Sequence, residues 1–132
     1  MSELATTNQG GLISLLHHGG WGSLPRPFGQ NIYLLETHIA GTTHVGNIKE
    51  IEPELLAGAR FDFFREPNNP YDTLAIVIKD SQGRKLGYVP RQNNEILAHL
   101  MDAGKKIYGT LHEKEYVDSW LKITIHIYME DL

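Results

Sequence analysis

Residues 119–128 alternate strictly between apolar side chains and polar or aromatic ones, and this pattern limits the possible folds more than any other feature. Every second position is a branched aliphatic residue, namely Leu121, Ile123, Ile125 and Ile127. Between them lie Trp120, Lys122, Thr124, His126 and Tyr128. Because neighbouring side chains of a β-strand point to opposite faces, we expect a strand whose aliphatic face is buried. A single strand of this kind is not stable alone, so the chain must build a sheet.

Five further segments have strand-like composition and are separated by turn-forming residues: 32–39, 59–66, 73–80, 85–89 and 106–112. In the third of them, Leu74, Ile76 and Ile78 alternate and predict one buried face. The turn from Asp80 to Gly83 predicts that the next strand returns antiparallel to this one. We expect the last of the five to pair with the alternating strand at the C-terminus.

Two segments have helical spacing instead. The first is short because Pro53 limits it and Gly58 ends it, and its apolar positions are Ile48, Ile51, Leu55 and Leu56. The second covers residues 93–103, with Asn93 or Asn94 as its cap, Gly104 at its end and an apolar stripe of Ile96, Leu97, Leu100 and Met101. About six strands with two or three short helices predict a mainly β fold, a small antiparallel barrel of the OB or SH3-like kind.

The first 30 residues differ from the rest because glycine and proline recur through them. We interpret residues 1–30 as a flexible arm with one short apolar stretch that contains Leu12, Ile13, Leu15 and Leu16. Residues 31–132 are predicted to form one barrel domain. A chain of 132 residues with 41% hydrophobic content usually buries a single core.

Charge is distributed unevenly along the chain. The formal net charge of −4 excludes a polycationic nucleic-acid binder, so any contact with phosphates must be local. Residues 36–72 carry an acidic excess, whereas residues 79–114 carry a basic excess. The basic segment either faces phosphates or is part of an ordinary mixed surface.

The sequence contains no cysteine, which excludes disulfides and thiolate metal sites and is consistent with a reducing cytoplasm, where we expect the protein to act. No apolar run is long enough to span a bilayer, and the N-terminus lacks a signal-peptide pattern. We therefore expect no membrane partner.

The segment Arg65–Asp72 contains two prolines around two asparagines, Pro67-Asn68-Asn69-Pro70. Each proline fixes its own φ and restricts the residue before it, so we expect a stiff loop between strands. This loop presents the ring of Tyr71, on which a base can stack, and the carboxylate of Asp72, which can accept a hydrogen bond from a hydroxyl. Asn69 adds donor and acceptor groups. In a purely structural alternative, Asp72 caps the turn and Tyr71 packs beneath the loop.

This loop, followed by Thr73-Leu74-Ala75-Ile76 and then by Leu86-Gly87-Tyr88-Val89-Pro90-Arg91, resembles the HIRAN family. Ile39-Ala40-Gly41-Thr42 extends the resemblance upstream, and the whole similarity covers roughly residues 32 to 128. Several prolines and glycines and a Tyr-Asp pair in fixed order are more specific than one short motif.

The resemblance implies a module that captures the free 3′ end of single-stranded DNA. Tyr71 would then stack on the last base, and Asp72 would hold the terminal hydroxyl. Arg91 matches a basic position of the family's DNA site, and Tyr88 matches a ring position. Trp120 falls where the family has an aromatic residue beside the strand, although packing at the core or its rim is the simpler interpretation of this tryptophan.

One departure from the family pattern follows the first strand. Where a basic-aromatic pair is expected, this chain has Thr42-Thr43-His44. Thr43 and His44 can donate hydrogen bonds but offer little stacking and no permanent charge, so we expect weaker capture of the 3′ end.

Catalytic motifs are not apparent in the sequence. The seven histidines lack His-Glu-x-x-His or similar spacing, no Gly-rich phosphate loop ends in Lys-Ser or Lys-Thr, and Glu50, Glu52 and Glu54 indicate a solvated helix start. We therefore predict no metal, no cofactor and no enzymatic activity. The resemblance implies helicase or nuclease machinery as a partner in DNA repair or remodelling. The alternative is a protein-interaction or homo-oligomerisation module that docks through the N-terminal arm.

Overall fold

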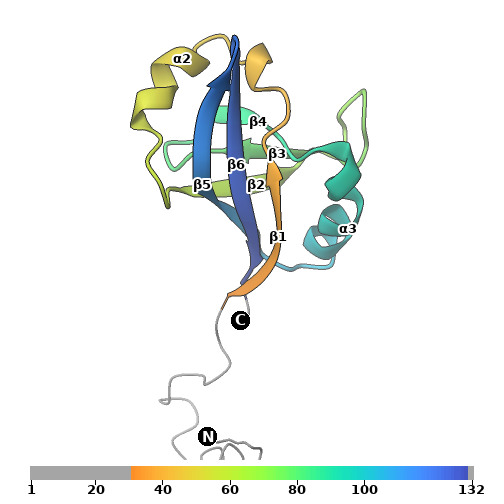
Figure 1. The fold of residues 1–132 in the computed structure, drawn as a ribbon. Helices are drawn as coiled ribbons and strands as arrows, with labels where there is room; N and C mark the ends of the chain where they lie inside the picture. The colour runs from red at the N-terminus through yellow and green to blue at the C-terminus, as the bar shows by residue number, and fades with distance from the viewer. Residues whose placement is uncertain (1–30, 131–132) are drawn as a thin grey trace, which may run out of the picture. The chain divides into compact units, whose positions relative to one another are not determined.

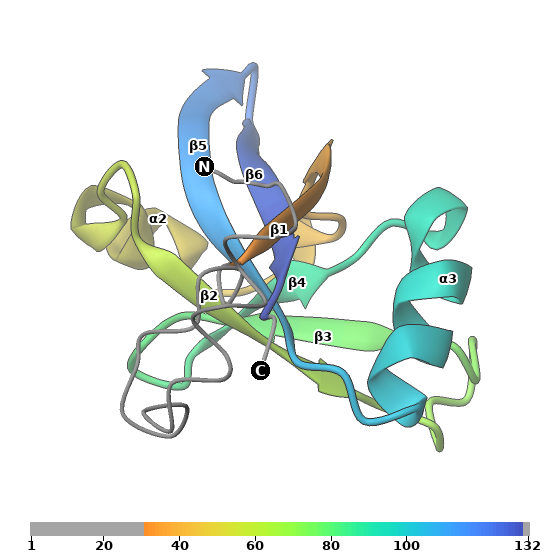
Figure 2. The same cartoon turned by 90° about the horizontal axis from the view of Figure 1, so that it is seen from below.

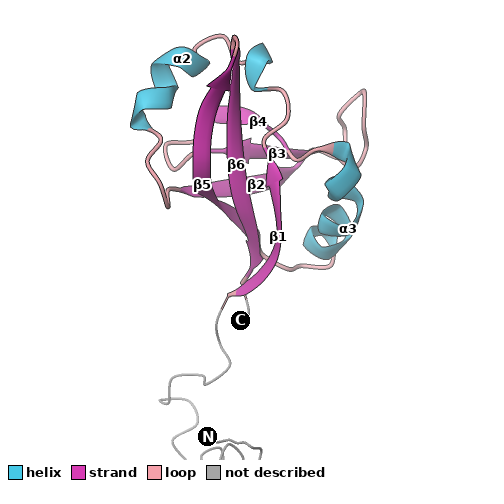
Figure 3. Ribbon diagram, viewed as in Figure 1, coloured by secondary structure: helices cyan, strands magenta, loops and turns pink. Residues whose placement is uncertain are grey.

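The computed structural model describes residues 31–130, which form a six-stranded antiparallel sheet in the order β1-β6-β5-β2-β3-β4 (Figures 1 and 3). The strands are β1 (Ile32–His38), β2 (Arg60–Arg65), β3 (Ile76–Lys79), β4 (Lys85–Tyr88), β5 (Ile107–Val117) and β6 (Trp120–Met129). The prediction of a mainly β, antiparallel, barrel-like fold is confirmed. Residues 1–30, for which we predicted an arm, lie outside the described residues, as do residues 131 and 132.

The core lies between two parts of the curled sheet. The strands β1, β6 and β5 run across β2, β3 and β4, as the two views in Figures 1 and 2 show. The predicted inward face of β6 is confirmed, because Leu121, Ile123, Ile125 and Ile127 are at most 2% exposed. These side chains share one cluster with Phe61 of β2. Full burial of each aliphatic side chain stabilises the fold by about 2 kcal/mol.

The two edges of the sheet meet just beyond the end of β1. Ala40 forms an isolated antiparallel bridge with Tyr88 of β4, in which each backbone N–H donates to the other residue's carbonyl at 2.8 Å. Gly87 is required at this place, because a Cβ there would lie 2.3 Å from the carbonyl oxygen of Ala40. The bridge therefore closes the curled sheet, and we call it the Ala40–Tyr88 seam.

The helices lie outside the barrel. The short η3 (Thr42–His44), α2 (Ile48–Ile51) and η4 (Glu52–Glu54) follow β1, and α3 (Arg91–Asp102) follows β4. Figure 2 shows α2 and α3 on opposite sides of the sheet. As predicted, Gly104 ends α3 with a positive φ and donates its backbone N–H to Met101. Among the described residues, no helix combines the length and the apolar character needed to cross a membrane.

Helix α3 begins two residues earlier than predicted. Its N-cap is Pro90, and neither Asn93 nor Asn94 caps it. The predicted apolar stripe is wrong at Ile96, which is 67% exposed, whereas Leu97 is fully buried. Asn94 is also buried, because its side chain serves a tertiary contact described below.

Three other predictions need correction, and they concern β3, Leu56 and β5. Strand β3 begins at Ile76 rather than at residue 73, and both of its faces are buried because Val77 is as inaccessible as its neighbours. The predicted buried face is confirmed at Ile76 and Ile78, but a strand covered on both sides has a continuous apolar sequence, and the burial of the second face was not predicted. Leu56 does not join the core and is 68% exposed, because α2 and η4 end before it. Strand β5 runs to Val117, five residues beyond the predicted end.

Candidate functional site

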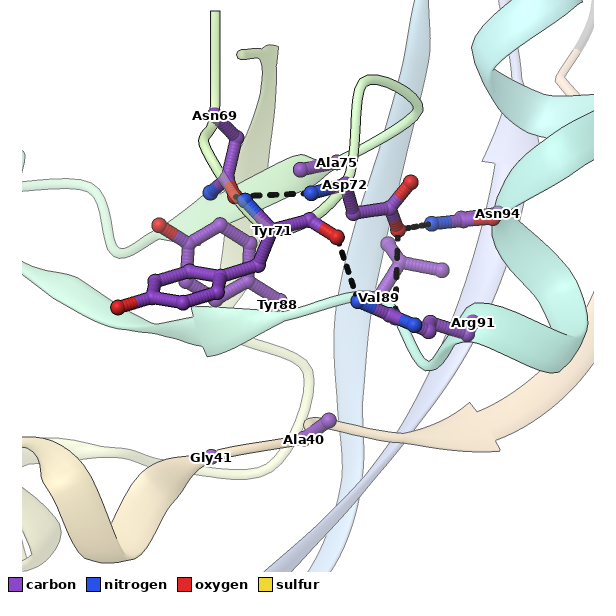
Figure 4. A pocket seen from close by; sticks show the side chains of 10 residues that line it. All are labelled: Ala40, Gly41, Asn69, Tyr71, Asp72, Ala75, Tyr88, Val89, Arg91 and Asn94. Atoms are coloured by element: carbon purple, nitrogen blue, oxygen red, sulfur yellow. Dashed lines mark hydrogen bonds and ion pairs between the residues drawn. The ribbon is translucent and has the colours of Figure 1, made fainter.

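A pocket of about 270 Å³ opens beside the Ala40–Tyr88 seam (Figure 4). It is lined by the loop that follows β2, the end of β4 and the start of α3. Five of the predicted site residues lie in it, namely Asn69, Tyr71, Asp72, Tyr88 and Arg91, together with Ala40, Gly41, Ala75, Val89 and Asn94. The five predicted residues, which run from Asn69 to Arg91 in the sequence, therefore share one surface.

The loop between β2 and β3 is fixed by Asn69. Its side-chain oxygen accepts the backbone N–H groups of Tyr71 at 2.8 Å and Asp72 at 3.2 Å, and its amide nitrogen donates to Glu66 at 3.1 Å. Such a turn orients two consecutive residues without help from a ligand. Asn69, which was predicted to contact DNA, lines the pocket, and its polar groups also hold the loop that carries Tyr71 and Asp72.

Asp72 is held by three neighbours. One carboxylate oxygen accepts the backbone N–H of Leu74 at 2.9 Å, as the structural alternative predicted. The other oxygen accepts a hydrogen bond of 2.7 Å from the buried amide of Asn94 and lies 3.7 Å from the Arg91 guanidinium. The hydrogen bond from Leu74, then that from Asn94, lowers the pKa of Asp72. The ionised group still has acceptor capacity toward the pocket, because each carboxylate oxygen carries two lone pairs.

Tyr71 does not pack beneath the loop, so this part of the structural alternative is wrong. Its side chain is 85% exposed, which makes it the most exposed large hydrophobic residue described. Its backbone carbonyl accepts a 2.7 Å hydrogen bond from Arg91, so the backbone is fixed although the ring is not covered. An aromatic face that stands in solvent on an ordered backbone is suited to stack on a planar ligand.

Arg91 occupies the first turn of α3, beside Pro90. One terminal nitrogen donates to the Tyr71 carbonyl, while the side chain remains 73% exposed. A guanidinium has five N–H donors, so others remain for an anion. The backbone N–H groups at the start of a helix add partial positive charge at the same place.

Tyr88 connects the pocket with two neighbouring hollows. Tyr88 lines both of these hollows. One is also lined by Lys85 and the proline-containing loop. The other is also lined by Gly41, His44, Val45, Asn47, Arg84 and Lys85. We call the three adjoining pockets the Tyr88 groove. Four arginine and lysine side chains line it: Arg65, Arg84, Lys85 and Arg91. The basic excess predicted for residues 79–114 thus reaches this surface.

The hydroxyl of Tyr88 is engaged inside the groove. It donates to Glu66 at 2.7 Å and accepts from the Lys85 ammonium at 3.0 Å, which also lies 4.5 Å from the ring centroid. The hydrogen bond from Tyr88 is the main cause of a lowered pKa at Glu66, and the amide of Asn69 contributes as well. Glu66 thereby joins the strand that carries Tyr88 to the loop that carries Tyr71.

The remaining predicted site residues do not all lie in the same place. His44 is exposed and lines the far end of the Tyr88 groove, and Thr43 is exposed beside it in η3. Thr42 is fully buried and donates its hydroxyl to the carbonyl of Leu121 at 2.7 Å, so it anchors η3 to the barrel. Trp120 does not line the groove and packs edge-on against His38 at 5.9 Å between ring centroids, which agrees with the packing interpretation.

Three residues of the site were missed by sequence analysis. Arg65 donates to the carbonyls of Ala75 and Thr73 and forms a two-point ion pair with Asp102 of α3. Glu66 and Asn94 hold Tyr88 and Asp72 respectively. Their partners are distant in sequence, so no local pattern could indicate these roles.

Comparison with known proteins agrees with the fold. A crystal structure of a protein from Lactobacillus plantarum is similar, with a TM-score of 0.71 and 26% identity over 77% of this chain and 97% of that one. The HIRAN domain of human HLTF gives a TM-score of 0.60 and 21% identity over 77% and 80% of the two chains. An NMR structure of the HLTF HIRAN domain in its DNA-bound conformation gives a TM-score of 0.54 and 20% identity over 76% and 80%.

At the sequence level, 38 residues are 45% identical to the helicase-like transcription factor of Oryctolagus cuniculus, which is 29% of this chain and 4% of that protein. The matched part is thus a small portion of that relative. A family model described as HIRAN domain matches residues 32–130, which include all six strands and the whole Tyr88 groove. The chain therefore belongs to the HIRAN domain family.

Proposed function

We propose that the Tyr88 groove binds single-stranded DNA and holds its free 3′ end in the pocket between Tyr71 and Arg91. The observation that carries the proposal is the convergence of three complementary groups on one open pocket: an exposed ring, an ionised carboxylate and an exposed guanidinium. A strand terminus has a base that can stack on the ring, a hydroxyl that can donate to the carboxylate and a phosphate that can bind the guanidinium.

Each group has a separate role in this proposal. The last base stacks on Tyr71, the terminal hydroxyl donates to Asp72, and Arg91 contacts the phosphate that precedes the last nucleotide. Lys85 and Arg84 line the groove beyond, where further phosphates of the strand would lie. The HLTF HIRAN domain, whose structure has been determined in a DNA-bound conformation, supports the choice of DNA as ligand.

The charge of Asp72 restricts which terminal group of a strand can lie beside it. A carboxylate repels phosphate, so the group beside Asp72 must be one without negative charge that can donate a hydrogen bond. A free 3′ hydroxyl meets this requirement, whereas a terminal phosphate does not. We extend the proposal to a role without catalysis in DNA repair or remodelling, alongside helicase or nuclease machinery in the cytoplasm.

Fluorescence anisotropy with three thymidine oligonucleotides that differ only at the 3′ end tests the proposal. We expect the free 3′ hydroxyl to bind most tightly, a dideoxy end more weakly, and a 3′ phosphate most weakly because repulsion is added to the lost hydrogen bond. Repetition at a second salt concentration measures how many phosphates are contacted. Equal affinity for the three ends would remove end recognition, and negligible binding of all three would favour the protein-interaction alternative.

A further inference from the structure

Two histidines and a glutamate from three different strands meet on the outer face of the sheet. They are Glu36 of β1, His112 of β5 and His126 of β6, and one ligand atom of each lies within 4.8 Å of those of the others. The Nε2 atom of His126 is 2.9 Å from a carboxylate oxygen of Glu36. None of the three lines the Tyr88 groove.

The pairing of the strands brings the cluster together. Glu36 and His126 are direct cross-strand partners, so their side chains share one face. A β-bulge between Leu111 and Glu113 leaves His112 as the extra residue of β5. Its ring stacks on that of His126, with 4.1 Å between centroids and 19° between planes. Bulges commonly redirect a side chain in this way.

A second aromatic ring also packs against His126. Tyr33 of β1 packs edge-on against it, with 5.3 Å between ring centroids. The side chain is 24% exposed, whereas that of Glu36 is 54% exposed and His112 is also exposed. One ligand atom is thus positioned by packing, and the two others can adjust their rotamers around it.

We propose that Glu36, His112 and His126 form a binding site for a divalent transition metal of the zinc class. Imidazole nitrogen and carboxylate oxygen are ligands that zinc accepts, and three protein ligands leave a fourth position for water. Zinc–ligand bonds near 2 Å place tetrahedral ligand atoms about 3.3 Å apart. The 2.9 Å between Glu36 and His126 is within about 0.4 Å of this spacing, so a slight separation of this pair and a rotamer change of the exposed His112 are sufficient.

The site bridges three strands that are neighbours in the sheet (Figure 1). Strand β1 is an edge strand, held on one side by β6 along its length. A metal that ties Glu36 to β6 and β5 binds only the folded arrangement of the sheet, so it must stabilise the fold. Spacing along the sequence could not reveal this site, because its ligands are 14 to 90 positions apart.

Zinc titration of the tag-free full-length chain, followed by calorimetry and by the melting temperature, tests the proposal. His17 and His18 lie outside the described residues and offer adjacent imidazoles, so both are replaced by alanine in every protein compared. We expect zinc, but not magnesium, to raise the melting temperature, because magnesium prefers oxygen ligands in octahedral geometry. His112→Ala should abolish the response.

Two further variants make the result decisive. His99→Ala removes an exposed histidine from α3 and should leave zinc binding unchanged. Glu36→Gln keeps both histidines and should weaken binding roughly tenfold or more, since losses of this size follow even when a group that only supports a metal ligand is removed. The proposal is overturned when His112→Ala and Glu36→Gln respond to zinc as the His99→Ala protein does. Loss of DNA binding in the oligonucleotide experiment would leave it untouched, because the two sites share no residue.

Discussion

Asp72 shows how one carboxylate can serve the fold and a ligand together. Its contacts with the backbone of Leu74, with Asn94 and with Arg91 all favour the ionised form. They fix the direction of the carboxylate before any ligand arrives, which reduces the entropy lost on binding. Because the charged group accepts hydrogen bonds and cannot donate them, it is suited to a ligand that carries a donor.

We predict that the preference for a free 3′ hydroxyl is independent of pH from about pH 8 to about pH 5, since ordinary carboxylates titrate near pH 4. The hydrogen bonds from Leu74 and Asn94 lower the pKa of Asp72, so its charge is lost only when the pH falls through this lowered value. Anisotropy with hydroxyl and dideoxy thymidine oligonucleotides gives the preference as a ratio. Asp72→Asn should bring the ratio close to one at every pH.

Tyr71→Ala should weaken DNA binding by about 1–3 kcal/mol, the usual value for the loss of one base-stacking ring. Tyr71→Phe should bind as the unchanged protein does, because the ring face is kept. The melting temperature should not change, since the side chain is 85% exposed. Tyr116→Ala removes another exposed tyrosine, at the far end of β5, and serves as the control. A large fall in melting temperature for Tyr71→Ala would contradict the view that this ring serves a ligand.

Arg91→Ala should lower the affinity for all three oligonucleotides alike and reduce the salt slope of binding by about one. The reason is that a phosphate contact carries no information about the 3′ end. Lys49→Ala removes an exposed cation from α2, outside the Tyr88 groove, and should alter neither quantity. An Arg91→Ala protein that kept full affinity but lost the end preference would reverse the roles that we assign to Arg91 and Asp72.

At the level of elements, α3 and the loop after β2 act as one unit. Arg65 joins them, because its guanidinium binds two loop carbonyls and the carboxylate of Asp102 at the end of α3. Its side chain is only 15% exposed, so this ion pair is better shielded from water than most surface pairs. Asn94 makes a second connection, from the first turns of α3 to Asp72.

Arg65→Ala should increase the rate of amide hydrogen exchange in residues 66–75, because three of its hydrogen-bond partners belong to this loop or to α3. We also expect the affinity for DNA to fall, although Arg65 lines only the neighbouring hollow and not the pocket of Asp72 and Arg91. Arg60→Ala removes an ion pair with Glu130 elsewhere on the barrel and is the matched control. Unchanged exchange in the loop would show that its prolines and Asn69 are sufficient to hold it.

The elements were predicted well from the sequence where their pattern was local. The alternation in β6, the turn at Asp80 and the glycine end of α3 were all readable, because each depends on a few neighbouring residues. The start of α3 was not, since Pro90 begins the helix without a side-chain cap and Asn94 is used in a tertiary contact. The burial of both faces of β3 could not be predicted either, because it depends on which other elements cover the strand.

At the level of the whole molecule, the site exists only because the barrel closes. The Ala40–Tyr88 seam joins the two ends of the strand order and places Gly41 and His44 beside β4. Sequence analysis predicted Tyr71, Asp72, Tyr88 and Arg91 as candidates through their family resemblance, and the structure places all four on one pocket. Sequence analysis could not predict the seam or the cluster of Glu36, His112 and His126, because both depend on contacts between strands that are distant in sequence.

Gly87→Ala should lower the free energy of unfolding by roughly 2 kcal/mol or more, at the upper end for a single substitution. The new Cβ would lie 2.3 Å from the carbonyl oxygen of Ala40 and 2.6 Å from the side chain of Ile39, so the seam must open. Gly46→Ala has open space around its Cβ and is the control. Urea denaturation measures both. Equal stability of the two variants would mean that the chain absorbs the clash without separating the strands.

The two short hydrogen bonds of the seam have a thermodynamic consequence. A strand of DNA that contacts both the Arg91 end and the His44 end of the groove would cross the Ala40–Tyr88 seam. It would therefore favour the barrel with the seam closed over the barrel with the seam open. By reciprocity, a change that destabilises the closed seam must also lower the affinity for DNA, even when every DNA contact is intact. Occupancy of the groove and tightness of the barrel are then two measurements of a single equilibrium.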